Sequence, residues 1–152
     1  MSLPHPILAI DYGEARVGLA MTDASGILPH PLETVENNDA MMEVINAIIA
    51  KHQIQSLLIG HPLRLDGSEG TSAIKVRKFK KLLQASLTHQ LPIDLMDERH
   101  STVEASKKLH QAGKNNRKQK SIIDQAAAVE ILNNYLEKLD NPFGLLSDPF
   151  QD

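Results

Sequence analysis

The stretch Ile7–Thr22, ILAIDYGEARVGLAMT, decides the fold. It opens with a short apolar run, Ile7–Ile10, which ends at one carboxylate, Asp11, and a second apolar run follows over Val17–Met21. This pattern predicts two paired strands, the first of them buried on both faces. A carboxylate beside the core is costly unless a cation balances its charge. We therefore expect a divalent metal ion next to Asp11.

Length and composition are those of one ordinary globular domain. The chain has 152 residues, of which 41% are hydrophobic and 23% charged. No apolar run approaches the roughly 18–20 residues that span a bilayer, and the N-terminus lacks a signal-peptide pattern. The absence of cysteine excludes disulfides, thiolate catalysis and thiolate zinc sites. These features favour a cytoplasmic protein without a membrane partner.

Charge is distributed unevenly along the chain. The formal net charge is −3, but residues 64–120 contain 13 Lys and Arg against 6 Asp and Glu. This excess predicts a surface that faces a polyanion such as a nucleic acid. The alternative is that Lys75 and its basic neighbours up to Lys81 form only the solvated side of a helix. Charge alone does not choose between the two.

Hydrophobic periodicity predicts an α/β fold with a single mixed sheet of three antiparallel strands plus parallel strands, flanked by helices. The expected strands cover residues 7–10, 17–21, 27–35, 56–59 and 92–96. The expected helices run from an Asp39 N-cap to His52, from a Thr71 or Ser72 cap to Leu87, from Ser101 to Ala112 and from Ser121 to Leu139. The inner face of the second helix should hold Val76, Phe79, Leu82, Leu83 and Leu87. We expect a basic loop at Lys114–Lys120, a domain over residues 1–140 and a tail over 141–152.

Three acids fall at the ends of predicted elements: Asp11, Glu98 after the last strand, and Asp124 in the first turn of the last helix. Ligands gather at strand ends in α/β sheets, so these carboxylates could converge. Clustered acids repel one another unless cations neutralise them, and Mg²⁺ prefers oxygen ligands. Two simpler explanations stay open. Asp124 could be the capping-box partner of Ser121, and Glu98 could be a solvated surface charge.

Other motifs are weaker. The segment Gly67–Ser72, GSEGTS, could hold a phosphate on backbone N–H groups, or it could be a flexible loop with a helix cap. The seven histidines show no ligand-like spacing. With only 3% aromatic residues, stacking on bases would be sparse. Any nucleic-acid contact should then be made mostly to phosphates.

Four segments, in order, resemble the signature blocks of the YqgF/RuvX family of small bacterial RNase H-like proteins. They are DYGEARVG (11–18), GHPLRLDGSE (60–69), DERHSTVEA (97–105) and KSIIDQAAAVEIL (120–132). The resemblance implies a nuclease dependent on Mg²⁺ or Mn²⁺ that processes the 5′ end of pre-16S rRNA. Alternatives are a Holliday junction resolvase on four-way DNA junctions and a non-catalytic nucleic-acid-binding module. We expect a monomer or weak homodimer.

The resemblance also implies roles for particular residues. The family's acidic positions fall on Asp11, Glu98 and Asp124, which would hold the metal and act in catalysis. Arg16 and Arg99 match basic positions of the motifs and would lie near the scissile phosphate. The remaining residues expected to bind nucleic acid are Arg64, Lys75, Lys78, Lys114, Arg117, Lys118 and Lys120.

Overall fold

A computed structural model describes residues 2–98 and 117–140. One five-stranded sheet forms its centre, with the strand order β3-β2-β1-β4-β5. The strands are β1 (Ile7–Asp11), β2 (Arg16–Thr22), β3 (Pro29–Glu36), β4 (Ser56–His61) and β5 (Ile93–Asp97). The first three strands pair antiparallel, whereas β4 and β5 run parallel to β1. The expected mixed sheet is confirmed.

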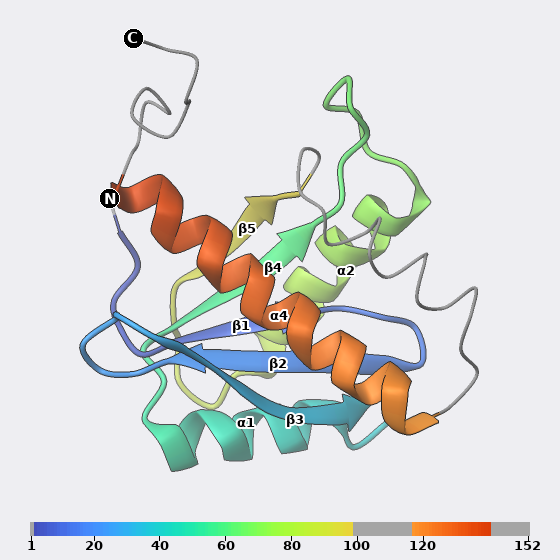
Figure 1. Ribbon diagram of the computed structural model, residues 1–152. Helices are drawn as coiled ribbons and strands as arrows, with labels where there is room; N and C mark the ends of the chain where they lie inside the picture. The colour runs from blue at the N-terminus through green and yellow to red at the C-terminus, as the bar shows by residue number, and fades with distance from the viewer. Residues whose placement is uncertain (1, 99–116, 141–152) are drawn as a thin grey trace, which may run out of the picture.

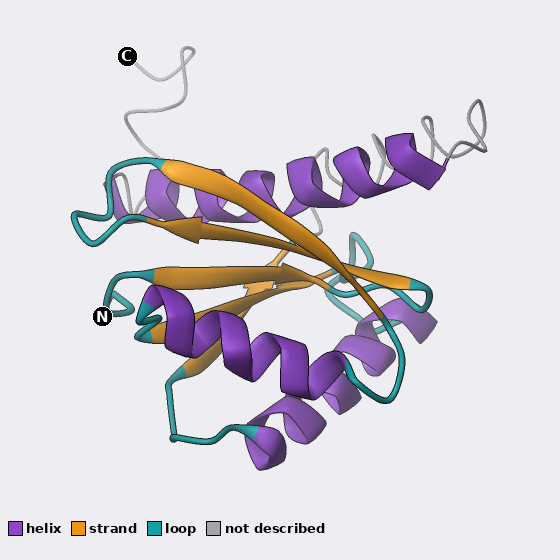
Figure 2. Cartoon of the chain, turned by 90° about the horizontal axis from the view of Figure 1, so that it is seen from below, coloured by secondary structure: helices purple, strands orange, loops and turns teal. Residues whose placement is uncertain are grey.

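Helices cover both faces of this sheet (Figure 1). Helices α1 (Met41–His52) and α2 (Thr71–Ser86) lie on one face, and α4 (Arg117–Asp140) crosses the other (Figure 2). Strand β1 is buried along its whole length because helices lie above and below it. None of the described helices is long and apolar enough to cross a membrane.

Two clusters of buried side chains follow from the alternation of side chains along β1. Leu8 and Ile10 belong to the cluster under α1 and α2. Ile7 and Ala9 point to the other face and pack with Ile131 of α4 and its neighbours. Asp11 is the next residue in this second series, so its side chain belongs to the face that α4 covers.

The start of α4 differs from the prediction. The helix begins at Arg117, so Arg117–Lys120 is helical and not part of a basic loop. Ser121 therefore lies inside the helix, and the capping-box explanation of Asp124 is wrong. The run before Ser121 contains no Pro or Gly, and Lys, Arg and Gln all favour helices. Nothing in the local sequence stops the helix from extending backward.

The other two helix starts were also predicted inaccurately. The N-cap of α1 is Ala40 and that of α2 is Gly70, in place of Asp39 and of Thr71 or Ser72. Leu82 was expected on the inner face of α2 but is 63% exposed, because the buried series is Ala73, Val76, Phe79 and Leu83. The helix expected from Ser101 and the tail after residue 140 lie outside the described residues.

Candidate active site

Asp11 ends β1 between two strands that both carry a glycine at the neighbouring position. Its partner across the antiparallel pair is Gly18 of β2. On the parallel side Ile10 pairs with Ile59 of β4, so Gly60 lies beside Asp11. The Asp11 carboxylate is therefore flanked by two residues without side chains, yet the residue is only 6% exposed. Side chains and backbone from other elements must therefore shield the Asp11 carboxylate from solvent.

Asp124 of α4 covers the first glycine. A Cβ atom added to Gly18 would lie 2.1 Å from the Asp124 backbone oxygen and 3.0 Å from the Asp124 Cβ. Only a glycine in β2 lets the helix come this close to the sheet. This close approach fixes the Asp124 side chain, 6% exposed as a residue, near the Asp11 end of the sheet.

Ile131 of α4 and Glu98 together cover the second glycine. Glu98 directly follows β5, and its backbone N–H donates a 3.0 Å hydrogen bond to the His61 carbonyl of β4. A Cβ atom added to Gly60 would lie 2.7 Å from the Ile131 Cδ1 and 3.6 Å from the Glu98 Cγ. Glu98 is 5% exposed, so the alternative explanation, a solvated surface charge, is wrong. Its burial needs another explanation.

The structure thus places all three predicted acids between the sheet and α4, at the ends of β1 and β5. Such a set of carboxylates offers the hard oxygen ligands that Mg²⁺ and Mn²⁺ take, and the donor chemistry fits such an ion. Within residues 2–98 and 117–140, however, no three His, Asp or Glu side chains already stand in an arrangement that could hold a metal. Each acid lies on β1 or near a strand that pairs with it, but the three do not form a finished metal site.

Arg16 occupies part of this location. It is the first residue of β2, and its Nε donates a 3.2 Å hydrogen bond to the Asp124 Oδ2. The exposed fractions of the two side chains are 18% and 8%. The sequence placed Arg16 near the substrate phosphate, and this pairing with an acid 108 residues away was not expected. A local sequence pattern carries no signal for it.

A second cluster holds the loop that follows β4. Glu69 bridges two side chains: its Oε2 lies 3.0 Å from the His61 Nε2, and the Arg77 Nε donates to both carboxylate oxygens. The hydrogen bond from Arg77 lowers the pKa of Glu69 below its usual value, with a smaller contribution from His61. These contacts explain the Gly67–Ser72 segment as a loop tied to α2.

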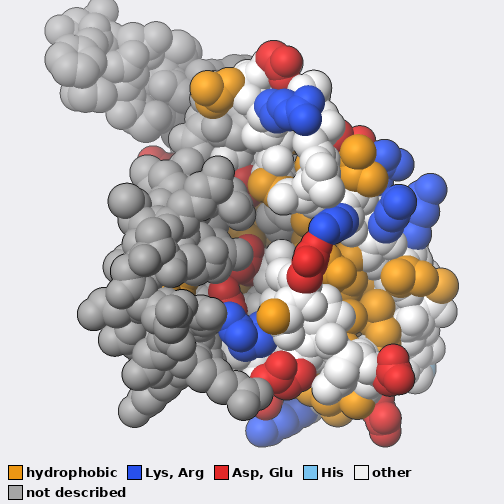
Figure 3. All heavy atoms as spheres, turned by 90° about the vertical axis from the view of Figure 1, so that its right-hand side faces the viewer, with side chains coloured by type: hydrophobic (Ala, Val, Ile, Leu, Met, Phe, Trp, Pro, Cys, Tyr) orange, Lys and Arg blue, Asp and Glu red, His pale blue; other side chains and the backbone are white. Residues whose placement is uncertain are grey.

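The predicted nucleic-acid-binding residues have different environments. Arg64 is exposed in the loop after β4, and Lys75 and Lys78 are exposed on α2. Lys75 makes an ion pair with Glu14 in the β1–β2 connection. On this side of the molecule basic and acidic side chains are interspersed (Figure 3). Arg117, Lys118 and Lys120 lie in the first turns of α4, while Arg99 and Lys114 lie outside the described residues.

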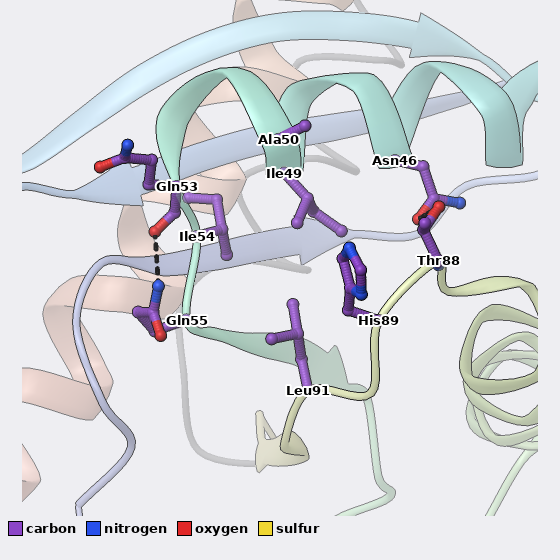
Figure 4. Close-up of a pocket in the computed structure, with 9 residues that line it drawn as sticks. All are labelled: Asn46, Ile49, Ala50, Gln53, Ile54, Gln55, Thr88, His89 and Leu91. Atoms are coloured by element: carbon purple, nitrogen blue, oxygen red, sulfur yellow. Dashed lines mark hydrogen bonds between the residues drawn. The ribbon is translucent and has the colours of Figure 1, made fainter.

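A hollow of about 500 Å³ lies at the other end of the sheet, between α1 and the segment before β5 (Figure 4). Its lining is partly apolar, from Ile49, Ile54 and Leu91. The polar part of the lining comes from the amide side chains of Asn and Gln residues and from Thr88 and His89, and no Asp, Glu, Lys or Arg lines the hollow. Asn46 on its rim is already used: its Nδ2 donates to the Ser86 carbonyl, and its Oδ1 accepts from the Thr88 N–H. This hollow carries no hydrolytic chemistry.

Comparison with known proteins agrees with the geometry. Residues 5–138 match the RuvX family, described as Holliday junction resolvases. The chain belongs to this family. A relative from Cutibacterium acnes named "Putative pre-16S rRNA nuclease" is 40% identical over 132 residues, which cover 87% of this chain and 82% of the relative. A relative of the same name from Streptomyces avermitilis is 42% identical, covering 86% and 84%.

A solved structure shares the fold of this RuvX-family chain. Thermus thermophilus RuvC in complex with a Holliday junction matches with a TM-score of 0.51 and 12% sequence identity. The match covers 88% of this chain and 94% of the RuvC chain. The expected RNase H-like fold is thereby confirmed, and at this identity the match speaks for the fold alone.

Proposed function

We propose that the protein is a metal-dependent endonuclease that processes the 5′ end of pre-16S rRNA, with Asp11, Glu98 and Asp124 as its catalytic and metal-binding residues. The observation that carries the proposal is the burial of three carboxylates, each 5–6% exposed, on one face at the strand ends. Burying several like charges is costly, and their retention is typical of a functional site. The names of the relatives support pre-16S rRNA as the substrate. Such a substrate would place the protein in the cytoplasm.

The chain's own residues would act as follows. Asp11 would be the central ligand, because it lies between Gly18 and Gly60. Glu98 and Asp124 would approach the same ion from the two sides, since Asp124 lies against Gly18 and Glu98 lies near Gly60. A bound Mg²⁺ or Mn²⁺ would activate a water and neutralise charge on the scissile phosphate. Arg64, Lys75 and Lys78 would contact phosphates further along the backbone.

The direct test is cleavage of a pre-16S rRNA 5′ precursor by the purified protein with Mg²⁺. We expect Asp11→Asn to lower the cleavage rate at least about a hundredfold, because it removes a charged ligand of the site. Asp94→Asn is the matched control, since Asp94 is an exposed carboxylate on β5. Equal cleavage by wild type and Asp11→Asn would end the catalytic assignment.

A four-way DNA junction is the second candidate substrate, favoured by the description of the matching family. Symmetric resolution of a junction requires two active sites and hence a dimer. The same assay with a synthetic junction, together with light scattering, separates the two candidates. Junction cleavage by a dimer, with no cleavage of the rRNA precursor, would replace the RNA proposal. Binding of either substrate without any cleavage would identify a non-catalytic module.

A further inference from the structure

The ion pair between Arg16 and Asp124 stands at the place where the proposed metal site would form. Its two side chains are largely buried, at 18% and 8% exposure. Both are held by the backbone: Arg16 begins β2, and Asp124 is pressed against Gly18 two residues further along that strand. An ion pair in such surroundings is screened far less than one at the surface. Its strength therefore matters to whatever else Asp124 binds.

The bond also uses one of the two oxygens that Asp124 could offer to a metal. The Arg16 Nε donates to the Asp124 Oδ2, and a carboxylate oxygen engaged by a guanidinium is less available to a second cation. No three acidic or histidine side chains of the described ranges are arranged to hold an ion while this pair is made. An ion that takes the Asp124 Oδ2 would have to displace Arg16 from it.

We propose that Arg16 is an internal counter-cation that competes with the divalent ion for Asp124. The idea rests on the proposed function, because it takes the three acids as the metal site. In the metal-free protein Arg16 neutralises Asp124 and allows its burial. When the ion binds, Asp124 becomes one of its ligands together with Asp11 and Glu98. Arg16 is then released at the rim of the site, where its guanidinium can bind a phosphate of the substrate. Arg16 thus weakens metal binding in the absence of substrate.

Isothermal titration of the full-length protein with MnCl₂ tests this competition without any cleavage assay. We expect Arg16→Gln to raise the Mn²⁺ affinity about five- to tenfold, because Asp124 is then free to bind. Arg77→Gln is the matched control: it removes an arginine that also pairs with a carboxylate, but Glu69 is not one of the proposed ligands. Its Mn²⁺ affinity should equal that of the wild type.

The Asp124→Asn background distinguishes competition from simple charge repulsion. Competition predicts that Arg16→Gln has no effect on Mn²⁺ affinity once Asp124 is neutral, whereas repulsion from Arg16 would persist through Asp11 and Glu98. A persistent effect would overturn the inference. Arg16→Lys provides a second variant that keeps the charge and should raise the affinity less than Arg16→Gln. If Arg16→Gln fails to fold, the Lys variant decides: an affinity equal to or below that of the wild type overturns the inference.

The same titrations separate this inference from the proposed function. Mn²⁺ binding that is lost in Asp11→Asn but equal in the wild type and Arg16→Gln would overturn the role of Arg16 and leave the metal site standing. No Mn²⁺ binding to the wild type or to any variant would overturn both.

Discussion

The two ends of the central sheet have opposite chemistry. At the end where β1 and β5 finish, three buried carboxylates and Arg16 lie between the strands and α4. At the other end neutral polar groups hold the chain: the Ser56 Oγ donates to the Pro4 carbonyl, and the Gln55 N–H donates to the Pro6 carbonyl. The Asn46 side chain likewise forms hydrogen bonds with the backbone at the end of α2: it donates to the Ser86 carbonyl and accepts from the Thr88 N–H. One end concentrates charge and the other satisfies hydrogen bonds.

This difference separates function from stability. Buried like charges cost folding free energy and are kept where they act on a substrate or a cofactor. Buried neutral groups with hydrogen-bond partners hold the chain in place. Substitutions of the acids should therefore change activity far more than stability, and substitutions of the neutral hydrogen-bonded groups should do the reverse.

The largest expected effect is at Asp11. Asp11→Asn should abolish nuclease activity, yet its thermal unfolding midpoint without metal should not fall below that of the wild type. The physical reason is that removing one negative charge relieves repulsion among the three acids. Thermal unfolding in a chelator-containing buffer measures this directly. A clear loss of stability would mean that Asp11 is a structural residue.

The two glycines beside Asp11 give a second prediction. Gly18→Ala should lower the free energy of unfolding by about 3 kcal/mol, because the new methyl group meets the backbone of Asp124. Gly60→Ala is the matched control and should cost less, about 1 kcal/mol, since its nearest contact is the flexible end of Ile131. Urea unfolding of both variants gives the values. Equal costs would contradict the close approach of α4 to β2.

At the neutral end, Asn46→Ala should lower the free energy of unfolding by about 1–2 kcal/mol through lost hydrogen bonds. Its specific nuclease activity should equal that of the wild type, because Asn46 lies away from the acids. Urea unfolding and the cleavage assay together test this. Loss of activity in a folded Asn46→Ala protein would contradict the claim that only the acid end of the sheet acts in catalysis.

The smallest expected effect concerns pH and Glu69. Its pKa is lowered in the folded protein, chiefly by the hydrogen bond from Arg77. A lowered folded pKa means that the carboxylate stabilises the loop above its unfolded pKa, and that this contribution is lost as pH falls through the folded pKa. Glu69→Gln should therefore show a slightly shallower loss of stability between neutral and acidic pH. Acid titration followed by circular dichroism compares the two proteins, and identical curves would show that the bridge adds no stability.

The sequence predicted the parts of this arrangement that depend on local pattern. The ILAI run and its terminal acid predicted a buried β1 ending in Asp11, and the periodicity of α1 and α2 predicted both helices, apart from their N-caps. The signature blocks singled out Glu98 and Asp124. What the pattern could not predict depends on packing between distant segments. The partner of Arg16 and the contact of Gly18 with α4 are both of this kind.

The most direct test of the central claim is the position of a bound ion. Crystals of the protein soaked in MnCl₂ and measured at the manganese absorption edge would locate it by anomalous scattering. We predict one strong peak within coordination distance of the carboxylates of Asp11, Glu98 and Asp124, with the Arg16 guanidinium moved off Asp124. A peak elsewhere would contradict the account. So would the absence of any peak at the three carboxylates, with their positions unchanged after soaking.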